Sequence, residues 1–249
     1  MAELISFIAG NIMITKNVLV SKAGPETVKV PAIVFYIKSG NHNILVDTGP
    51  DPDLKLQIEK DEFPTERTQE QRVENLLKKI GLTVDDIDYV VLTHLHFDHA
   101  GSVKEFKKSK IFVQKDEFYF AFLPDWFSKG GYEQSDFNYS YLNYELIEGD
   151  YQLTEDVKLL FTPGHTHGSQ AIYVTLNSGK KILLAGDACY TLENFGPPKK
   201  LPGSYVDPQQ WGDSIEKLRH LTILEGAELW PSHDPDFYSK LKFVPYIYK

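Results

Sequence analysis

The segment from Val91 to Gly101, VLTHLHFDHAG, contains the strongest chemical signal in this chain, because four potential metal ligands follow a run of apolar residues. They are His94, His96, Asp98 and His99. Neutral imidazole and carboxylate are the donors that divalent zinc, manganese, iron and cobalt accept. Alternate side chains at a strand end point to one side, so His94 and His96 project together, while the later pair lies past the bend. The pattern therefore predicts a metal site.

Three more candidate ligands follow strand-like apolar runs further along the chain. His165 stands in FTPGHTHGSQ, Asp187 stands in KILLAGDACY, and His233 stands in WPSHDPD. A lone histidine is more often a structural residue satisfied by its neighbours than a metal ligand. Of the 8 histidines in the chain, three lie in the first segment and two lie here. A shared metal-binding role explains this clustering better than separate structural roles.

Short apolar runs of strand length recur along the chain and are mostly β-branched or aromatic. Seven of them are predicted to be strands: Ala32 to Ile37, Asn43 to Val46, Tyr89 to Leu92, Ile111 to Val113, Val157 to Phe161, Ala171 to Val174 and Ile182 to Leu184. The early runs follow one another as hairpins, while helical patterns separate the later ones. We therefore expect two mixed sheets packed face to face with helices outside, in a single domain of residues 1–249.

Two amphipathic helices are predicted from apolar spacing and end signals. The first combines the i, i+3, i+4, i+7 pattern with a capping box and a glycine stop. Its apolar residues are Val73, Leu76, Leu77 and Ile80, its box is Thr68 with Gln71, and its stop is Gly81. The second helix has Asp207 as N-cap and Pro208 in its first position, and it ends before Gly226.

The composition excludes several classes of protein. With 249 residues, 42% of them hydrophobic and 24% charged, the chain has the profile of a globular protein rather than a disordered or fibrous one. Its net charge of -9 repels phosphate backbones and anionic membranes, so we expect no nucleic-acid and no membrane partner. Neither a basic leader nor an apolar run of about 18 residues occurs, which favours a cytoplasmic protein.

The ligand pattern resembles the metallo-β-lactamase superfamily, whose hallmark is HxHxDH followed by a distant His, a bridging Asp and a final His. The resemblance covers nearly the whole chain and implies an α/β fold, an αββα sandwich of two mixed β-sheets flanked by helices. It also implies two divalent metal ions, with zinc as the first choice and manganese, iron or cobalt compatible. The implied ligands are His94, His96 and His165 for one ion, Asp98, His99 and His233 for the other, and Asp187 as the bridge.

Within the superfamily, the chain is similar to the N-acyl homoserine lactonases, which degrade quorum-sensing signals. The matching pieces are HLHFDHAG at 94 to 101, NYELIEGDY at 143 to 151, TPGHTHGSQ at 162 to 170, DACYTLENF at 187 to 195 and HD at 233 to 234. Tyr190 stands where a tyrosine reaches the active site in that family. Asp47, in ILVDTG, matches an early acidic position and is expected to orient the first cluster. His167 departs from the family pattern, which has proline there, and is interpreted as a rim histidine without a ligand role.

The implied enzyme is a dinuclear metal-dependent lactonase, a carboxylic ester hydrolase that opens the ring of N-acyl homoserine lactones and thereby quenches quorum sensing. A metal-bridging hydroxide would attack the ring carbonyl, since two cations lower the pKa of water toward neutrality. We expect one ion and the Tyr190 hydroxyl to stabilise the oxyanion, and Asp98 to deliver the proton to the leaving oxygen. The sequence contains no GxSxG motif, which agrees with a mechanism that needs no activated serine.

An aromatic-rich segment is the candidate wall of an apolar slot for the acyl chain. Its members are Phe118, Tyr119, Phe120, Phe122, Leu123, Trp126 and Phe127. The predicted substrate-binding residues are Phe97, Tyr190, Phe118, Phe122 and Trp126. Core packing is the competing role, and helical spacing places Phe118 and Phe122 on one face and Tyr119 and Trp126 elsewhere, so only part of the segment can be core. The same apolar surface is also suited to a homodimer.

Other functions on the same scaffold stay open at this stage. One is a different hydrolase, either a broad lactonase or a glyoxalase-type thioesterase. Another is a mononuclear iron oxygenase of the persulfide dioxygenase type, and a third is a non-catalytic binding protein, which the complete set of ligand positions disfavours. Antibiotic hydrolysis is disfavoured too, because some β-lactamase branches have a cysteine where Asp187 stands. Here Cys189 lies two residues later and is expected to point elsewhere.

Overall fold

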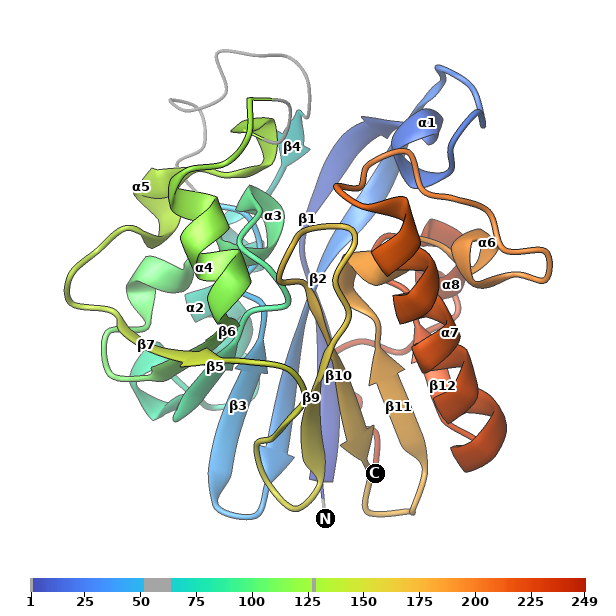
Figure 1. The fold of residues 1–249 in the computed structure, drawn as a ribbon. Coiled ribbons are helices and arrows are strands. Elements are labelled where there is room, and N and C mark those ends of the chain that lie inside the picture. Colours follow the sequence, from blue (N-terminus) through green and yellow to red (C-terminus); the bar gives the residue numbers. More distant parts are fainter. Residues whose placement is uncertain (1, 52–63, 127–128) are drawn as a thin grey trace.

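Two β-sheets lie face to face between helices in the computed structural model, which describes residues 2–51, 64–126 and 129–249 (Figure 1). The first sheet contains β1 (Ala2–Thr15), β2 (Thr27–Ser39), β3 (His42–Val46), β4 (Thr65–Glu66), β5 (Tyr89–Val91), β6 (Lys110–Gln114) and β7 (Asn143–Ile147), in the order β4-β1-β2-β3-β5-β6-β7. The second contains β8 (Tyr151–Gln152), β9 (Val157–Phe161), β10 (Gln170–Thr175), β11 (Lys181–Leu184) and β12 (Glu228–Trp230), in the order β12-β11-β10-β9-β8.

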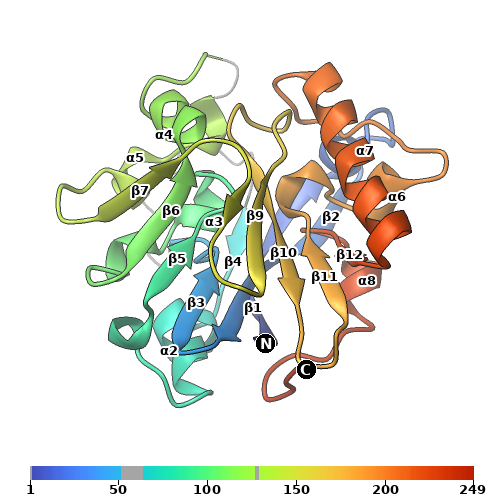
Figure 2. The same cartoon turned by 60° about the horizontal axis from the view of Figure 1, so that its bottom comes forward.

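Helices cover the outer faces of both sheets. They are α1 (Lys16–Leu19), α2 (Val73–Lys78), α3 (Phe97–Ala100), α4 (Lys115–Phe122), α5 (Gln134–Phe137), α6 (Leu192–Phe195), α7 (Pro208–Glu225) and α8 (Pro235–Tyr238). In Figure 1, α2 to α5 lie on the side of the first sheet and α6 and α7 on the side of the second, with both chain termini at the bottom. Figure 2 shows α7 along the outer face of β10 and β11. The αββα arrangement expected from the sequence is confirmed.

The strand β2 shows why the sheets stack as they do. Along a strand, successive side chains point to opposite faces. Ile33, Phe35 and Ile37 belong to the cluster between the two sheets, where they meet residues of β9, β10 and β11. Val34 and Tyr36 belong to a second cluster, between the first sheet and the helices α2 to α5. Because both faces of β2 are covered, its residues form a continuous apolar run instead of an alternating one.

The pairing of the strands follows the predicted pattern in the first sheet only. The strands β1, β2 and β3 are antiparallel neighbours, and β3, β5, β6 and β7 are parallel across helical connections. The expectation that helices separate all the later strands is wrong, because β8 to β11 form antiparallel neighbours joined by loops. The helix α7 then connects β11 to the parallel strand β12. The sequence prediction also missed β1, a strand of 14 residues.

The structure confirms one of the two predicted helices and shows that the other is shorter than predicted. The long one is confirmed: α7 has Asp207 as N-cap, whose carboxylate accepts two backbone N–H bonds, and it ends at Gly226 in the left-handed conformation. The first one is shorter than predicted. Thr68 and Gln71 do form a capping box, but this box caps a separate 3₁₀ turn. The extended backbone of Arg72 (ψ 137°) separates this turn from α2. The box sits one turn too early to cap the α-helix. Among the described residues, no helix is long and apolar enough to cross a membrane.

Isoleucine substitutions on α7 test which face of this helix is buried. Ile215 is fully buried against the second sheet, whereas Ile223 is 72% exposed. We expect Ile215→Ala to lower the free energy of unfolding by about 2–5 kcal/mol, because the buried apolar contacts are lost and a cavity forms. Ile223→Ala is the matched control and should change it by less than about 0.5 kcal/mol. Urea denaturation measures both, and equal losses in the two variants would contradict the assigned face.

Candidate metal centre

The histidine-rich segment begins where β5 ends and turns into α3. His94 and Leu95 are fully buried, and the Leu95 side chain belongs to the core beneath α2 to α5 while the flanking histidines point the other way. The helix α3 begins immediately after His96, whose backbone is still extended (ψ 154°). Asp98 and His99 therefore lie in the first turn of a helix, displaced from the first two histidines. The predicted bend within the motif is present.

The remaining candidates reach the same place from distant parts of the chain. His165 stands in the loop between β9 and β10. Asp187 follows β11 and His233 follows β12, and these two strands are parallel neighbours, so the loops after them leave the sheet side by side. The structure brings all seven predicted ligands together in two groups. They are His94, His96, His165 and Asp187 in one, and Asp98, His99 and His233 in the other.

Three nitrogen atoms define the first group. His94 Nε2 lies 3.0 Å from His96 Nδ1, and His165 Nε2 lies 3.2 Å and 3.1 Å from these two atoms. Ligands about 2.0–2.1 Å from a tetrahedral zinc ion are about 3.3–3.4 Å apart. The nitrogens therefore form a triangle close to one face of such a tetrahedron.

The carboxylate of Asp187 connects the two groups. Its Oδ2 atom lies 3.3 Å from His165 Nε2 and 3.6 Å from His94 Nε2. Its Oδ1 atom faces the second group, at 3.3 Å from His99 Nε2 and 3.2 Å from His233 Nε2. Each oxygen of one carboxylate thus addresses a different group, which is the geometry that a bridging ligand needs.

The second group is completed by Asp98. Its Oδ2 atom lies 3.3 Å from both His99 Nε2 and His233 Nε2. Among the described residues, the buried atoms His99 Nε2 and Asp187 Oδ1 have no hydrogen bond of acceptable geometry, although they lie 3.3 Å apart. Buried polar atoms without partners are costly and uncommon in proteins. A divalent cation would satisfy both atoms, so the residues present fit the metal site that the sequence predicts.

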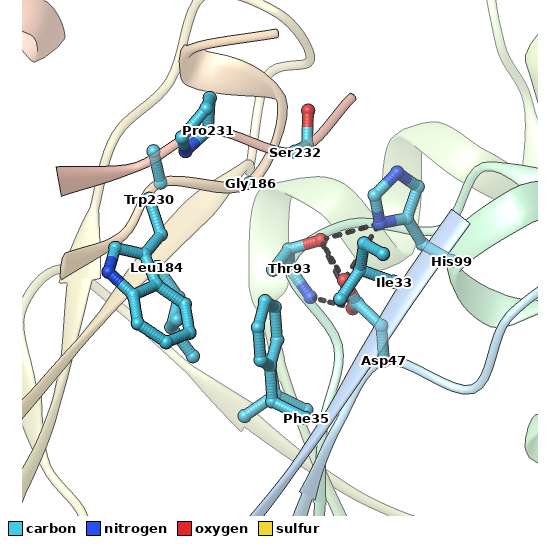
Figure 3. A pocket seen from close by; sticks show the side chains of 12 residues that line it. Ile33, Phe35, Asp47, Thr93, His99, Leu184, Gly186, Trp230, Pro231 and Ser232 are labelled. Carbon is cyan, nitrogen blue, oxygen red and sulfur yellow. Dashed lines mark hydrogen bonds and ion pairs between the residues drawn. The ribbon is translucent and has the colours of Figure 1, made fainter. Parts of the chain in front are cut away.

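In the second group, the opposite nitrogen of each imidazole is held by an acceptor outside the groups. His99 Nδ1 lies 2.7 Å from Asp47 Oδ2, and His233 Nδ1 lies 2.9 Å from the carbonyl oxygen of Pro31. Asp47 also accepts from the backbone N–H of Thr93 at 2.8 Å (Figure 3). An acceptor at Nδ1 keeps the proton there and leaves the Nε2 lone pair for the centre. The geometry agrees with the orienting role expected for Asp47.

Three of the histidines are held in the neutral form. Burial lowers the pKa of His165, lowers that of His94 further, and takes that of His96 to about 3. Neutral imidazole is the form that binds a metal ion. The first group is therefore ready to bind a cation without losing protons.

The histidines of the second group behave in the opposite way. Burial lowers the pKa of His99, but the carboxylates of Asp98 and Asp187 raise it more, so the net pKa lies well above its ordinary value. His233 also has a raised pKa, because Asp187 outweighs the effect of burial. Without a cation, protons on these imidazoles balance the carboxylates.

A small cavity lies behind this second group, between the two sheets (Figure 3). Ile33, Phe35, Leu184 and Trp230 form its apolar wall, and Asp47, Thr93, His99 and Ser232 form its polar side. The cavity has room for about one water molecule. It is far too small for a substrate, which must approach from elsewhere.

Tyr190 and Phe97 lie beside the metal-ligand groups. The Tyr190 hydroxyl lies 3.1 Å from His165 Nδ1, and its ring centroid lies 5.7 Å from that of His233. Phe97 and Tyr190 share an apolar cluster with residues of β1, β2 and α1. Cys189, in contrast, donates from Sγ to the carbonyl oxygen of Thr191 and is fully buried, so its thiol points away from both groups as expected.

The predicted aromatic wall consists of partly buried side chains that pack against the core and of exposed ones. Phe118 meets Tyr144 edge to face with ring centroids 4.9 Å apart, and Phe122 contacts Phe137 at 5.5 Å. Trp126 is 87% exposed, and Phe127 lies outside the described residues. Phe118 and Phe122 lie on one face of α4 and Tyr119 is 59% exposed, as expected, whereas Trp126 lies beyond the end of the helix. The role of these side chains in substrate binding stays a prediction. His167 belongs to neither ligand group, and its ring contacts Phe120.

Sequence reasoning missed two buried residues that support the site. Thr93 donates its hydroxyl to Asp47 and lies 3.1 Å from His94 Nδ1. Glu117, in the first turn of α4, is fully buried. The position of Thr93 inside the histidine segment was a usable signal. Glu117 gave none, because an acidic residue in the first turn of a helix is ordinarily a solvated partner of the helix dipole.

Comparison with known proteins agrees with this fold and site. Residues 29–233 match the model of the metallo-beta-lactamase superfamily. The chain belongs to the metallo-beta-lactamase superfamily.

Its similar relatives within the superfamily are N-acyl homoserine lactonases. The chain is 31% identical to N-acyl homoserine lactonase AttM of Rhizobium radiobacter over 93% of this chain and 92% of the relative. It is 32% identical to N-acyl homoserine lactonase AiiA of Bacillus thuringiensis subsp. kurstaki, over 91% of this chain and 90% of the relative. A solved N-acyl homoserine lactone hydrolase with N-hexanoyl-L-homoserine at its catalytic metal centre superposes with a TM-score of 0.90, at 29% identity, over 99% of this chain and 98% of that one.

Binding of ions to the ion-free protein is expected to release protons. His99 and His233 have raised pKa values and must lose a proton before Nε2 can bind a cation. The affinity for one of two ions should therefore weaken as the pH falls from about 8 to about 6, where these imidazoles hold their protons more fully. Calorimetric titration with zinc in two buffers of different ionisation enthalpy counts the protons. Binding without proton release, at a pH-independent affinity, would contradict the assigned charges.

The substitution Asp47→Asn tests how the His99 ring is oriented. The amide can place a nitrogen against His99 Nδ1, so the preferred tautomer is lost and Nε2 no longer faces the centre reliably. We expect the affinity for one ion to fall about 10- to 100-fold, measured by competition with a chromogenic chelator. Asp85→Asn changes an exposed aspartate and is the matched control. If both variants bind zinc like the unmodified protein, Asp47 has no orienting role.

Proposed function

We propose that this protein is a metal-dependent hydrolase that opens the lactone ring of N-acyl homoserine lactones. The observation that carries this proposal is the pair of His/Asp groups joined by Asp187, with the Tyr190 hydroxyl beside them. Relatives that cover nearly the whole chain are N-acyl homoserine lactonases. A γ-lactone is a cyclic ester, so its hydrolysis needs a nucleophilic water, a group that stabilises the negative carbonyl oxygen, and a proton for the departing alkoxide.

The residues that would hold two divalent ions follow from the two groups. One ion is assigned to His94, His96 and His165, the other to Asp98, His99 and His233, with Asp187 between them. When bound, such ions acidify water and polarise a carbonyl oxygen, which makes hydrolysis feasible at neutral pH. Imidazole and carboxylate donors suit zinc first and also accept manganese, iron or cobalt.

Asp98 is suited to move the proton of the reaction. Burial raises the pKa of its carboxyl group, but neighbouring His99 and His233 lower it more, so the group is ionised and able to accept. It takes a proton as water adds to the carbonyl carbon. It returns that proton to the ring oxygen as the bond between this oxygen and the carbonyl carbon breaks, which yields the open hydroxy acid. The same carboxylate thus acts first as base and then as acid.

Tyr190 is suited to stabilise the negative charge on the carbonyl oxygen. Burial raises the pKa of its phenol well above the ordinary value, so it keeps its proton and acts as a donor. When His165 carries its proton on Nδ1, this nitrogen donates to the Tyr190 hydroxyl oxygen across the 3.1 Å contact. The phenol proton is then available for another acceptor. A donor in a water-poor site strengthens its hydrogen bond as charge develops in the transition state.

The acyl chain needs an apolar surface next to this polar centre. Phe97 and Tyr190 provide one, together with Ile12, Leu19 and Val20 of the same cluster. Phe97 directly follows His96, so an acyl chain packed on it would place the lactone ring over the ligand groups. We assign the chain to the edge of this cluster in preference to Phe118 and Phe122 of α4, whose rings contact Tyr144 and Phe137.

A substrate panel tests the proposed activity. We expect the zinc-loaded protein to hydrolyse N-acyl homoserine lactones, with release of acid detected by a pH indicator, and to act far more slowly on glutathione thioesters and nitrocefin. Chelation should abolish turnover and added zinc should restore it. One iron per chain with uptake of oxygen would instead identify the persulfide dioxygenase alternative, and no turnover of any lactone by the loaded protein would reject the proposal.

The substitution Tyr190→Phe tests the proposed donor. Loss of one donor to a developing oxyanion should slow lactone turnover about 100- to 1,000-fold, with little change in zinc content because the phenol is not an assigned ligand. Tyr151→Phe, at a tyrosine that is 39% exposed, is the matched control. Full turnover by Tyr190→Phe would contradict this assignment.

A further inference from the structure

A carboxylate without an ionic partner is buried beside the first ligand group. Glu117 is 0% exposed, although it stands in the first turn of α4 directly after the exposed Asp116. Burial of a charged group is strongly unfavourable unless hydrogen bonds compensate. Among the described residues, no lysine or arginine forms an ion pair with it. Burial raises the pKa of Glu117, and only hydrogen-bond donors oppose this shift.

Two of the donors to Glu117 come from the segments that carry the histidines of the first group, and a third is Tyr132. Its Oε1 atom accepts from the backbone N–H of Leu95 at 2.9 Å and from the Tyr132 hydroxyl at 3.0 Å. Its Oε2 atom accepts from the backbone N–H of Gly168 at 3.2 Å. Leu95 stands between His94 and His96, and Gly168 stands three residues after His165. One side chain therefore ties the two metal-binding loops to α4.

The packing around these bonds leaves little freedom. A Cβ atom added at Gly168 would lie 2.2 Å from the backbone nitrogen of Glu117, so the loop after His165 can approach α4 this closely only with glycine. The Leu95 N–H must also point toward Glu117. In extended backbone side chains alternate, so the two flanking histidines lie on the face opposite to the buried Leu95 side chain. The bond from the Leu95 N–H holds the backbone that carries them.

The orientation of His96 is set by the same network. Among the histidines of the two groups, His96 alone presents Nδ1 to the centre, whereas the others present Nε2. Tyr132, held by Glu117, packs its ring on His96 with centroids 4.6 Å apart. A Cβ atom added at the neighbouring Gly131 would lie 2.5 Å from His96 Nε2. The far edge of the ring is thus enclosed, and Nδ1 is left facing the centre.

We propose that Glu117 is a positioning residue that sets the geometry of the first ligand group through Leu95, Tyr132 and Gly168. Its counterpart in the second group is Asp47, which contacts the histidine ring directly. Each group thus has one buried carboxylate behind it, and the two carboxylates contact different segments. This inference rests on the metal assignment made above, and it predicts that Glu117 affects one of two ions.

The test replaces Glu117 by glutamine, which keeps the shape but turns one oxygen into a donor that faces N–H groups. Zinc alone, titrated against a chromogenic chelator, is the probe. We expect Glu117→Gln to weaken one of two zinc sites about 10- to 100-fold and leave the other unchanged. Glu145→Gln, at an exposed glutamate paired with Lys110, is the matched control and should bind two ions like the unmodified protein.

A double-mutant cycle identifies which site is affected. In a His233→Ala background, which damages only the second group, Glu117→Gln should still weaken the remaining ion. In a His94→Ala background the same substitution should have no further effect. Equal weakening of both ions, or none, would overturn the proposal. Where Glu117→Gln fails to fold, Tyr132→Phe decides, because loss of one hydrogen bond should weaken the same site several-fold.

This outcome is independent of the substrate. If zinc binding changes as expected but no lactone is hydrolysed, the positioning role stands and the proposed function fails. If lactones are hydrolysed and Glu117→Gln binds both ions normally, the function stands and the positioning role is wrong.

Discussion

The structure depends on holding five imidazoles and two carboxylates within a few ångströms of one another in a nearly dry space. Three of the nitrogens lie only 3.0–3.2 Å apart. Lone pairs directed at one another repel, and buried carboxylates without countercharge are unstable. Protons on His99 and His233 supply part of the positive charge that balances the carboxylates. A pair of bound cations would supply this charge in place of the protons. The site is therefore a buried cluster of mutually repelling groups that the rest of the fold must hold in place.

Other parts of the fold hold each ligand-bearing loop in place through contacts on the side away from the centre. Two rigid sheets present the loop ends, and acceptors outside the centre hold the far side of the imidazoles. Asp47 and the Pro31 carbonyl do this for the second group. For the first group, Glu117 accepts hydrogen bonds from backbone N–H groups of two loops. Because these anchors come from elements distant in sequence, the ligand geometry is a property of the whole sandwich and not of the histidine motif alone.

The sequence predicted those parts of the molecule that are encoded locally. The residues that converge in the centre stand in short motifs at strand ends, and α7 carries both of its end signals within its own sequence. The parts that were missed depend on tertiary packing. The strand β1 was missed because Gly10 and Asn11, residue types that are uncommon in strands, interrupt its apolar run at an irregularity in the pairing with β2. Glu117 was missed because its burial results from loops that arrive from elsewhere. The aromatic residues of α4 illustrate the same limit, since composition cannot distinguish a core face from a ligand pocket.

The central claim is that Asp187 joins two ion sites into one centre, and anomalous scattering from crystals of the zinc-loaded protein tests it most directly. The account predicts two zinc peaks per chain, with Oδ1 of Asp187 bound to one ion and Oδ2 to the other. The reason is that Oδ2 lies near His165 of the first group and Oδ1 near His233 of the second. A single peak, or two peaks with Asp187 bound to only one of them, would contradict it.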